Sequence, residues 1–264
     1  MSGRDALPLI LLPPSEGKAE GGTGAAWEPG AMSIDLDGVR LGVLADLERA
    51  MRRSAADRGA LLGVKGDALV RATSANRSVR TSATLPAIER YTGVLYDELD
   101  ASGLPTASRR RLGRCVLVLS GLWGVVRPGD PVPDYKLKMG ATVGRGGRLS
   151  TRWAEPLTEA VAPLARGRRV WNLLPREHDA AWRPGPGLEQ VSVEFVEPGR
   201  DGRWVTVAHW NKLLKGALVR HLLAEPSTTP EDLVDWEHPA GFRYDPARRR
   251  DEPDRTVVVL SRGG

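Results

Sequence analysis

The 264-residue sequence has little cysteine and little histidine. Cys115 is its one cysteine, which excludes a disulfide-stabilised scaffold and a cysteine-rich zinc site. The four histidines, at positions 178, 209, 221 and 238, lack the His-x-x-x-His spacing of a common zinc motif. No pattern for haem or an iron–sulfur cluster accompanies them. We therefore expect no bound metal and no cofactor.

Long hydrophobic runs are also missing. The apolar stretch at 7–12 is broken by Pro8 and stopped by Pro13 and Pro14. It is too short for a membrane span and lacks the architecture of a signal peptide. The sequence therefore predicts a cytoplasmic protein without membrane contact.

Lysine is scarce as well, because only six of the 38 basic residues are lysines and the rest are arginines. Such an excess of arginine is what GC-rich coding produces. The net charge of +5 permits a polyanionic partner without requiring one. The positions of the lysines are more informative, because all six fall in four motif segments: Lys18, Lys65, Lys136, Lys138, Lys212 and Lys215.

The hydrophobic content of 41% and the charged content of 27% are typical of a globular protein. Residue patterns predict strands at 8–12, 115–119, 170–174, 191–197, 203–208 and 256–261. They predict helices at 46–58, 86–99, 150–166 and 210–224, and a helical turn at 231–236. These segments interleave without a regular βαβ rhythm, an internal repeat or a clean linker. We expect an α+β fold, a single compact domain over residues 1–264 with a central mixed sheet flanked by helices.

The first motif, at 61–70, has the pattern of a tight turn between two helices. Gly63 and Gly66 would supply unusual backbone angles, and Lys65 would add positive charge where the second helix begins. This pattern is typical of a helix-hairpin-helix element, which holds a nucleic-acid backbone without reading bases. Arg71 follows and would extend the contact. An ordinary turn whose glycines only cap helices is the alternative interpretation.

The second motif is the loop Pro-Pro-Ser-Glu-Gly-Lys at 13–18, directly after the first strand. Ser15 and Lys18 could bind an anionic group, and a desolvated Lys18 could act as a base or nucleophile. The spacing differs from that of a P-loop. A solvated turn is the alternative.

The third motif joins 119–128, which ends in Arg127 and Pro128, to 134–140. The second part places an acid, the phenol of Tyr135 and the ammonium groups of Lys136 and Lys138 within five positions. Together these groups could bind an anion or move protons. A structural salt-bridge corner is the alternative.

The fourth motif is a helix start at 209–216. Lys212 and Lys215 are three residues apart and share a face, where their mutual repulsion costs roughly a few tenths of a kcal/mol. A phosphate or a group of carboxylates would offset this cost, and a solvated helix face is the alternative. Asn172, at the end of the 170–174 strand, could enter the same pocket.

Two main hypotheses of function follow. The first is sequence-independent binding of DNA. The second is an enzyme acting on a small anionic or nucleotide-like substrate, with Lys18, Tyr135, Lys212 and Lys215 as catalytic candidates, because convergent lysines lower one another's pKa. A third interpretation is an interaction protein whose motifs are core architecture. The candidate anion-binding residues are Ser15, Lys18, Gly63, Lys65, Gly66, Arg71, Arg127, Lys136, Lys138, Asn172, Lys212 and Lys215.

The third motif resembles the most diagnostic segment of the YaaA family of peroxide-stress response proteins. The family pattern runs Leu-Ser-Gly-Leu-aromatic-Gly-Val-Leu-Arg-Pro, followed by Tyr-Arg-Leu-Glu-Met-Gly. Further similarities follow in order along nearly the whole chain. They are Pro14 to Lys18, Gly63 to Ala68, Tyr91-Thr92-Gly93, Asn172-Leu173, and Lys212 with Lys215-Gly216.

The resemblance implies a mixed α/β fold with a central sheet, a positively charged cleft and a cytoplasmic location. It also implies binding of DNA, including distorted forms, and a role in limiting oxidative damage by keeping unincorporated iron low. Two departures stand out: the loop from Ser15 to Lys18 is longer than the family's Pro-Ala-Lys, and Lys138 stands where the family has Glu.

Overall fold

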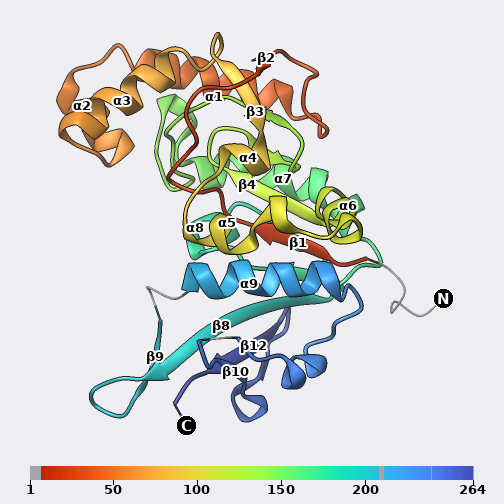
Figure 1. Cartoon of the computed structure of the whole chain (residues 1–264). Helices are drawn as coiled ribbons and strands as arrows, with labels where there is room; N and C mark the ends of the chain where they lie inside the picture. The colour runs from red at the N-terminus through yellow and green to blue at the C-terminus, as the bar shows by residue number, and fades with distance from the viewer. Residues whose placement is uncertain (1–6, 208–210, 239, 264) are drawn as a thin grey trace.

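The computed structural model describes residues 7–207, 211–238 and 240–263. Its centre is a sheet in which five neighbouring strands run parallel (Figure 1). In spatial order these are β12 (Thr256–Ser261), β8 (Gln190–Pro198), β7 (Val170–Asn172), β1 (Leu9–Leu12) and β4 (Val116–Ser120). Antiparallel strands flank them: β5 (Gly124–Val126), β9 (Trp204–Thr206), β10 (Arg243–Tyr244) and β11 (Arg250–Asp251). The α+β fold with a mixed central sheet is therefore confirmed.

Strands β1 and β4 are apolar along almost their whole length. Every residue of β1 and of β4 is buried, including Ser120. Parallel strands covered on both faces have this uninterrupted pattern, because neither side of the strand meets water. The predicted strands at 8–12, 115–119, 170–174 and 256–261 are confirmed within a few residues, and 191–197 and 203–208 form the predicted antiparallel hairpin up to residue 207.

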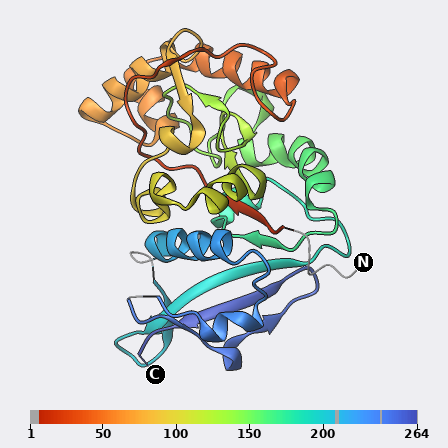
Figure 2. The same ribbon diagram turned by 45° about the vertical axis from the view of Figure 1, so that its right-hand side comes forward.

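Helices cover the sheet. On one side α9 (Asn211–Ala224) packs against α5 (Val94–Leu99) and α6 (Thr106–Cys115), and it lies between α5 and β8 in Figure 1 and Figure 2. A Cβ on Gly216 would collide with the carbonyl of Leu95, so the contact between α5 and α9 requires glycine there. Further helical elements are α4 (Ala87–Arg90), α7 (Leu149–Ala165), α8 (Arg176–Asp179), and the 3₁₀ turns η1 (Ala101–Gly103), η2 (Gly144–Gly146), η3 (Glu231–Asp235) and η4 (Pro246–Arg248).

A second, small sheet joins β2 (Gly24–Ala26), β3 (Ala83–Pro86) and β6 (Pro131–Val132). Beside it α1 (Asp37–Ala50), α2 (Ala55–Leu62) and α3 (Gly66–Arg77) form the end of the molecule farthest from the C-terminus (Figure 1). We call α2, α3 and the turn between them the hairpin.

Two predicted helices are wrong in extent. The segment 46–58 contains the end of α1 and the start of α2, because the Ser54 hydroxyl accepts a hydrogen bond from the N–H of Asp57 (3.2 Å) and begins a new helix. The segment 86–99 is divided between α4 and α5, because Gly93 adopts φ 96° between them. The helices at 150–166 and 210–224 are confirmed, although residue 210 lies outside the described residues. The described helices include none that is both long and apolar enough to cross a membrane.

Candidate functional site

Two of the predicted motifs, and the segment after β7, follow strands whose carboxyl ends lie at the same edge of the sheet. The loop 13–18 follows β1, Gly121 follows β4, and Leu173 follows β7. In the sheet, β4 lies beside β1 on one side, and β8, the next strand of the sheet after β7, lies on the opposite side. The position between β1 and β7 is therefore a topological switch point. Ligands of open sheets bind preferentially at such an edge.

A buried chain of hydroxyl groups lies at this edge. The Ser120 Oγ accepts hydrogen bonds from the backbone N–H groups of Leu122 (3.3 Å) and Trp123 (3.1 Å). Its proton is therefore directed to the Tyr135 Oη, 2.7 Å away, which lies 3.0 Å from the Tyr91 Oη. Burial raises the pKa of Tyr135 to about 12 and that of Tyr91 well above its usual value. We call Ser120, Tyr135, Tyr91 and the adjoining Lys18 the strand-edge cluster.

Lys18 is held against the two tyrosines. Its Nζ lies 4.2 Å from the ring centroid of Tyr135 and 5.7 Å from that of Tyr91, and it donates a hydrogen bond to the carbonyl of Ser15 (3.1 Å). Burial lowers the pKa of Lys18 to about 8, against the opposing attraction of Asp134. The amine is therefore partly neutral in mildly alkaline solution, which is the condition for a lysine to act as a base or nucleophile.

The loop that carries Lys18 is tied down by its own side chains. The Ser15 hydroxyl donates to the carbonyl of Gly17 and accepts from the N–H of Thr92 (3.1 Å). The Glu16 carboxylate pairs with Lys136 (2.9 Å) and Lys138 (3.3 Å). The pKa of Glu16 is lowered, chiefly because Lys136 donates a hydrogen bond to its carboxylate. The second and third motifs thus meet through Glu16, which was not among the predicted site residues.

The third motif is also joined to the hairpin. Asn76 of α3 is fully buried, and its amide accepts from the backbone N–H of Lys136 (2.8 Å) and donates to the carbonyl of that residue (2.9 Å). This pairing imitates a strand contact and positions Lys136. Sequence reasoning missed Asn76, because a single asparagine within a helical segment carries no signal of a distant partner.

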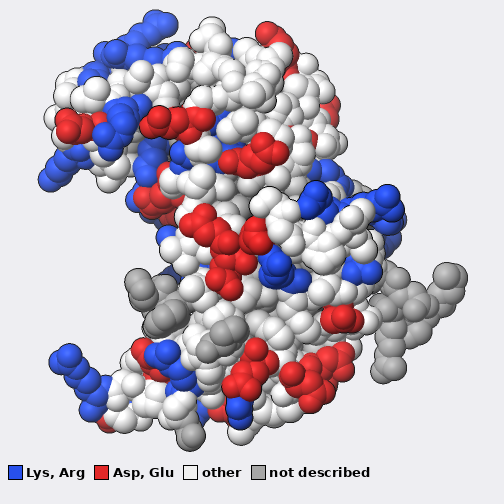
Figure 3. Space-filling view, in the orientation of Figure 1, with Lys and Arg blue, Asp and Glu red and all other residues white. Residues whose placement is uncertain are grey.

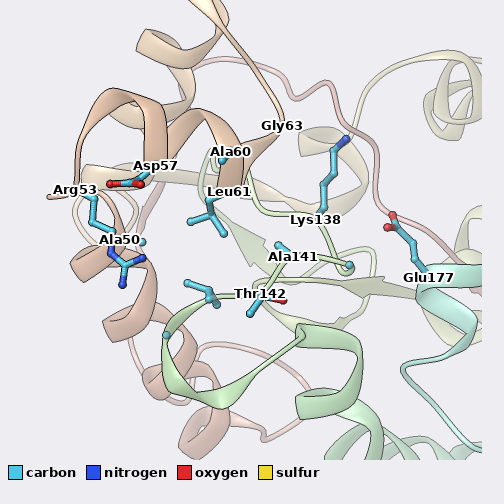
Figure 4. Close-up of a pocket in the computed structure, with 13 residues that line it drawn as sticks. Ala50, Arg53, Asp57, Ala60, Leu61, Gly63, Lys138, Ala141, Thr142 and Glu177 are labelled. Atoms are coloured by element: carbon cyan, nitrogen blue, oxygen red, sulfur yellow. The ribbon is translucent and has the colours of Figure 1, made fainter.

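A cavity of about 580 Å³ separates the hairpin from the body of the molecule (Figure 4). Leu61 and Gly63 line it from the hairpin, and Lys138, Ala141 and Glu177 from the body. Figure 4 shows Lys138 reaching from its loop toward Gly63. The structure therefore brings together Gly63 and Lys138 of the predicted anion-binding set.

The hairpin turn is open to solvent. Gly63 ends α2 with φ 67°, Gly66 begins α3 with φ 53°, and Lys65 between them is exposed, as is Arg71 on α3. Within the described structure no side chain caps the N-terminus of α3. Its first-turn N–H groups are therefore free to meet an anion.

The fourth motif divides between two environments. Lys215 is 9% exposed; its Nζ donates to the carbonyl of Leu173 (2.9 Å), and burial lowers its pKa to about 8. Lys212, one turn earlier, is exposed. Asn172 is buried, where its amide donates to Asp179 (2.6 Å) and accepts from the N–H of Leu174 (3.1 Å). Its hydrogen-bonding groups are thus occupied within the fold.

Arg127 lies apart from the other predicted residues. Strand β5 runs antiparallel to β4, so the chain returns toward the amino ends of the parallel strands before it reaches Arg127. There the guanidinium donates to the carbonyl of Gly113 (3.3 Å). Proximity to Ser120 in sequence therefore does not place Arg127 in the strand-edge cluster.

No group of three or more His, Cys, Asp or Glu side chains in the described ranges is arranged to hold a metal ion. His178 is buried, and burial lowers its pKa to about 4. The groups that the structure brings together at the strand edge are lysine, tyrosine and serine side chains and the Glu16 carboxylate.

Comparison with known proteins identifies relatives over most of the chain. A family model described as peroxide stress protein YaaA matches residues 9–248. A UPF0246 protein of Streptomyces coelicolor is 38% identical over 241 residues, covering 90% of this chain and 92% of that protein. A UPF0246 protein of Corynebacterium efficiens is 35% identical over 257 residues, covering 95% of this chain and 100% of that protein. The chain therefore belongs to the peroxide stress protein YaaA family.

Proposed function

We propose that this protein acts in the response to peroxide stress by binding DNA, largely without sequence preference, through the hairpin and the basic surface around it. The family description supports the stress-response role. The observation that carries the DNA-binding role is the exposed, uncapped turn at Gly63–Gly66, which lies in a segment where basic residues outnumber acidic ones.

The charge of this region is strongly one-sided. Residues 52–80 contain seven arginines and lysines and two aspartates. Figure 3 shows Lys and Arg gathered over the end of the molecule that carries α2 and α3, whereas Asp and Glu gather over the middle of the same face. Because DNA carries one negative charge per about 1.7 Å of helix axis, such a concentrated basic surface attracts it far more than an even distribution of +5 would.

The turn itself supplies phosphate-binding geometry. The positive end of the α3 dipole and its free N–H groups lie at the exposed Gly66, and Lys65 adds an exposed ammonium group. These groups bind phosphate and do not distinguish base pairs, since backbone contacts carry no sequence information directly. Arg71, exposed on α3, extends the same surface.

Fluorescence anisotropy with short duplexes of unrelated sequence tests this proposal. Lys65→Glu should weaken binding to every duplex alike, and the slope of log K against log salt should fall by about 0.9 for each DNA phosphate that the variant no longer neutralises. Arg200→Glu, in the exposed β8–β9 turn, makes the same change in net charge and serves as the control. Equal weakening in both variants, or unchanged binding by Lys65→Glu, would exclude the hairpin as the DNA-binding element.

We further propose that bound protein limits iron-driven oxidative damage to the DNA. Strand breakage of a duplex by ferrous iron and peroxide should fall when wild-type protein is present and should fall less with Lys65→Glu. Equal breakage with the two proteins, at concentrations where only wild type is bound, would separate DNA binding from protection.

The strand-edge cluster supports a second candidate function, an enzyme acting on a small anionic or nucleotide-like substrate. The specific observation is Lys18, whose Nζ lies against the Tyr135 ring with a pKa of about 8. Borohydride reduction in the presence of aldehyde and keto metabolites, followed by peptide mapping, tests for a nucleophilic amine. An adduct at Lys18 that is absent at Lys212 would support it, and no adduct across the panel would count against imine chemistry.

A further inference from the structure

Five charged residues that the sequence motifs do not include surround a second cavity, of about 730 Å³. We define the arginine pocket as this cavity and its lining residues: Asp46, Arg49, Arg53, Gly144, Arg145, Gly146 and Arg152. We propose that the arginine pocket binds a ligand with two or more neighbouring phosphate groups. None of the residues of the hairpin turn lines it, so it is a site separate from that turn.

The charge of the lining matches such a ligand. Four guanidinium groups face a single carboxylate, which leaves an excess of three positive charges, and none of the described lining residues is apolar or aromatic. A neutral or hydrophobic ligand would find no complementary surface here. Guanidinium groups present planar pairs of N–H donors that match phosphate oxygens, and several together suit an anion with more than one phosphate.

The pocket is built around one buried ion pair. The Asp46 carboxylate is 9% exposed and accepts from Arg152 (2.6 Å). Glycines leave the room for this pair: a Cβ on Gly144 would collide with the Asp46 carboxylate, and one on Gly42 would collide with the Arg152 guanidinium. The pair joins α1 to α7, and η2, which carries Arg145, packs against α1 beside it.

The other three arginines have guanidinium N–H donors that no carboxylate of the described residues accepts. Arg53 and Arg145 are exposed and pair with no carboxylate in the described part of the chain, and Arg49 uses one terminal nitrogen on Asp46 while its side chain is 65% exposed. Three guanidinium groups converging on one cavity repel one another. A bound polyanion would relieve this repulsion, which is the physical reason to expect one.

The arginine pocket adjoins the cavity beside the hairpin. Arg53 and Gly144 line both cavities, and the floor of the neighbouring one includes Ala60, Leu61 and Ala141. A nucleoside attached to bound phosphates therefore has space to extend. Neighbouring phosphates occur both in free polyphosphates and nucleotides and in the backbone of DNA, so the experiment must separate these two sources.

Isothermal titration calorimetry of the full-length protein with inorganic tripolyphosphate measures binding of a free polyphosphate. Fluorescence anisotropy with a duplex measures binding of the DNA backbone. The test variant is Arg49→Gln/Arg145→Gln, because both side chains are exposed and the buried Asp46 carboxylate keeps its pairing with Arg152. The matched control is Arg200→Gln/Arg203→Gln in the β8–β9 turn. Circular dichroism and thermal unfolding check that each variant remains folded.

We expect wild type to bind tripolyphosphate and the test variant to bind it at least tenfold more weakly, with the control unchanged. A decrease in duplex affinity and salt slope alone would also support the site and would identify DNA as the source of its phosphates. If the test variant and the control bind both ligands equally, or if wild type binds neither, the proposal is wrong. A protein that binds tripolyphosphate through these arginines but binds no duplex would overturn the proposed DNA-binding function and leave this site standing.

Discussion

The hairpin turn and the strand-edge cluster each carry a lysine in a glycine-containing loop, yet the two lysines have opposite environments. Lys65 is exposed at an uncapped helix start. Lys18 lies 4.2 Å from the ring centroid of Tyr135, and burial lowers its pKa to about 8. The first arrangement leaves an ammonium group open to a large polyanion, whereas the second holds an amine beside hydroxyl groups, partly neutral in mildly alkaline solution.

Because of this difference, substitutions in one region should mainly change binding affinity, and substitutions in the other should mainly change stability. Side chains of the hairpin turn make few contacts that hold the fold, so their replacement should change affinity more than stability. At the strand edge, Ser120, Tyr91 and Tyr135 are buried and hydrogen-bonded to one another, so their replacement should change stability first. Substitutions in the two regions test this contrast, beginning with the largest expected effect.

Glycine replacement should distinguish the two regions most clearly. A Cβ on Gly121 would lie 2.8 Å from backbone atoms of Lys138 and Met139, which cannot move aside easily. Gly121→Ala should therefore reduce the free energy of unfolding by about 3 kcal/mol or more. Gly66→Ala meets open space and carries only the cost of φ 53°, about 1 kcal/mol. Urea denaturation measures both, and equal reductions would contradict the contrast.

Asn76 links the two regions, so its removal should affect both. Asn76→Ala leaves the partly buried N–H and carbonyl of Lys136 without their partner and should cost about 1–2 kcal/mol of unfolding free energy. Ser74→Ala, at an exposed position on the same helix, should change stability by less than about 0.5 kcal/mol. Hydrogen exchange at Lys136 should rise only in the first variant, and protection retained there would show that other contacts hold this segment.

The two buried lysines predict an unusual dependence of stability on pH. With a folded pKa of about 8 against 10.5 in the unfolded chain, Lys215 holds fewer protons when folded between these values, so stability should increase as pH rises from about 7.5 to about 9.5. The contribution of Lys215 is about 1–2 kcal/mol over this range. Lys215→Met should remove it, whereas the exposed Lys212→Met should keep the wild-type slope. Identical slopes in the two variants would show that Lys215 is not desolvated in solution.

The smallest expected change in stability is at the hairpin turn. Lys65→Gln removes an exposed charge without a carboxylate partner among the described residues, so the free energy of unfolding should stay within about 0.5 kcal/mol of wild type. The same variant should weaken duplex binding and lower its salt slope by about 0.9. A decrease in stability above about 1 kcal/mol would place Lys65 in the fold and not in the binding surface.

Residue patterns within short segments were sufficient to predict much of the fold and part of the candidate site. Continuous apolar runs predicted β1 and β4, and paired glycines around Lys65 predicted the turn between two helices. The break between α1 and α2 was missed, because a serine cap competes with an apolar pattern that continues across it. The positions of single side chains relative to distant partners, such as Asn76 against Lys136, have no local signature.

The sequence by itself determined the family, the apolar strands and the concentration of basic residues between 52 and 80, because each depends on residues near one another in the chain. Only the tertiary structure decided which charges are buried and which converge. Packing of α9 over the sheet buries Lys215, and the antiparallel return of β5 carries Arg127 away from Ser120. The arginine pocket joins α1 to residues about a hundred positions later, and electrostatic interactions depend on distance in space and on burial, which spacing along a chain does not fix.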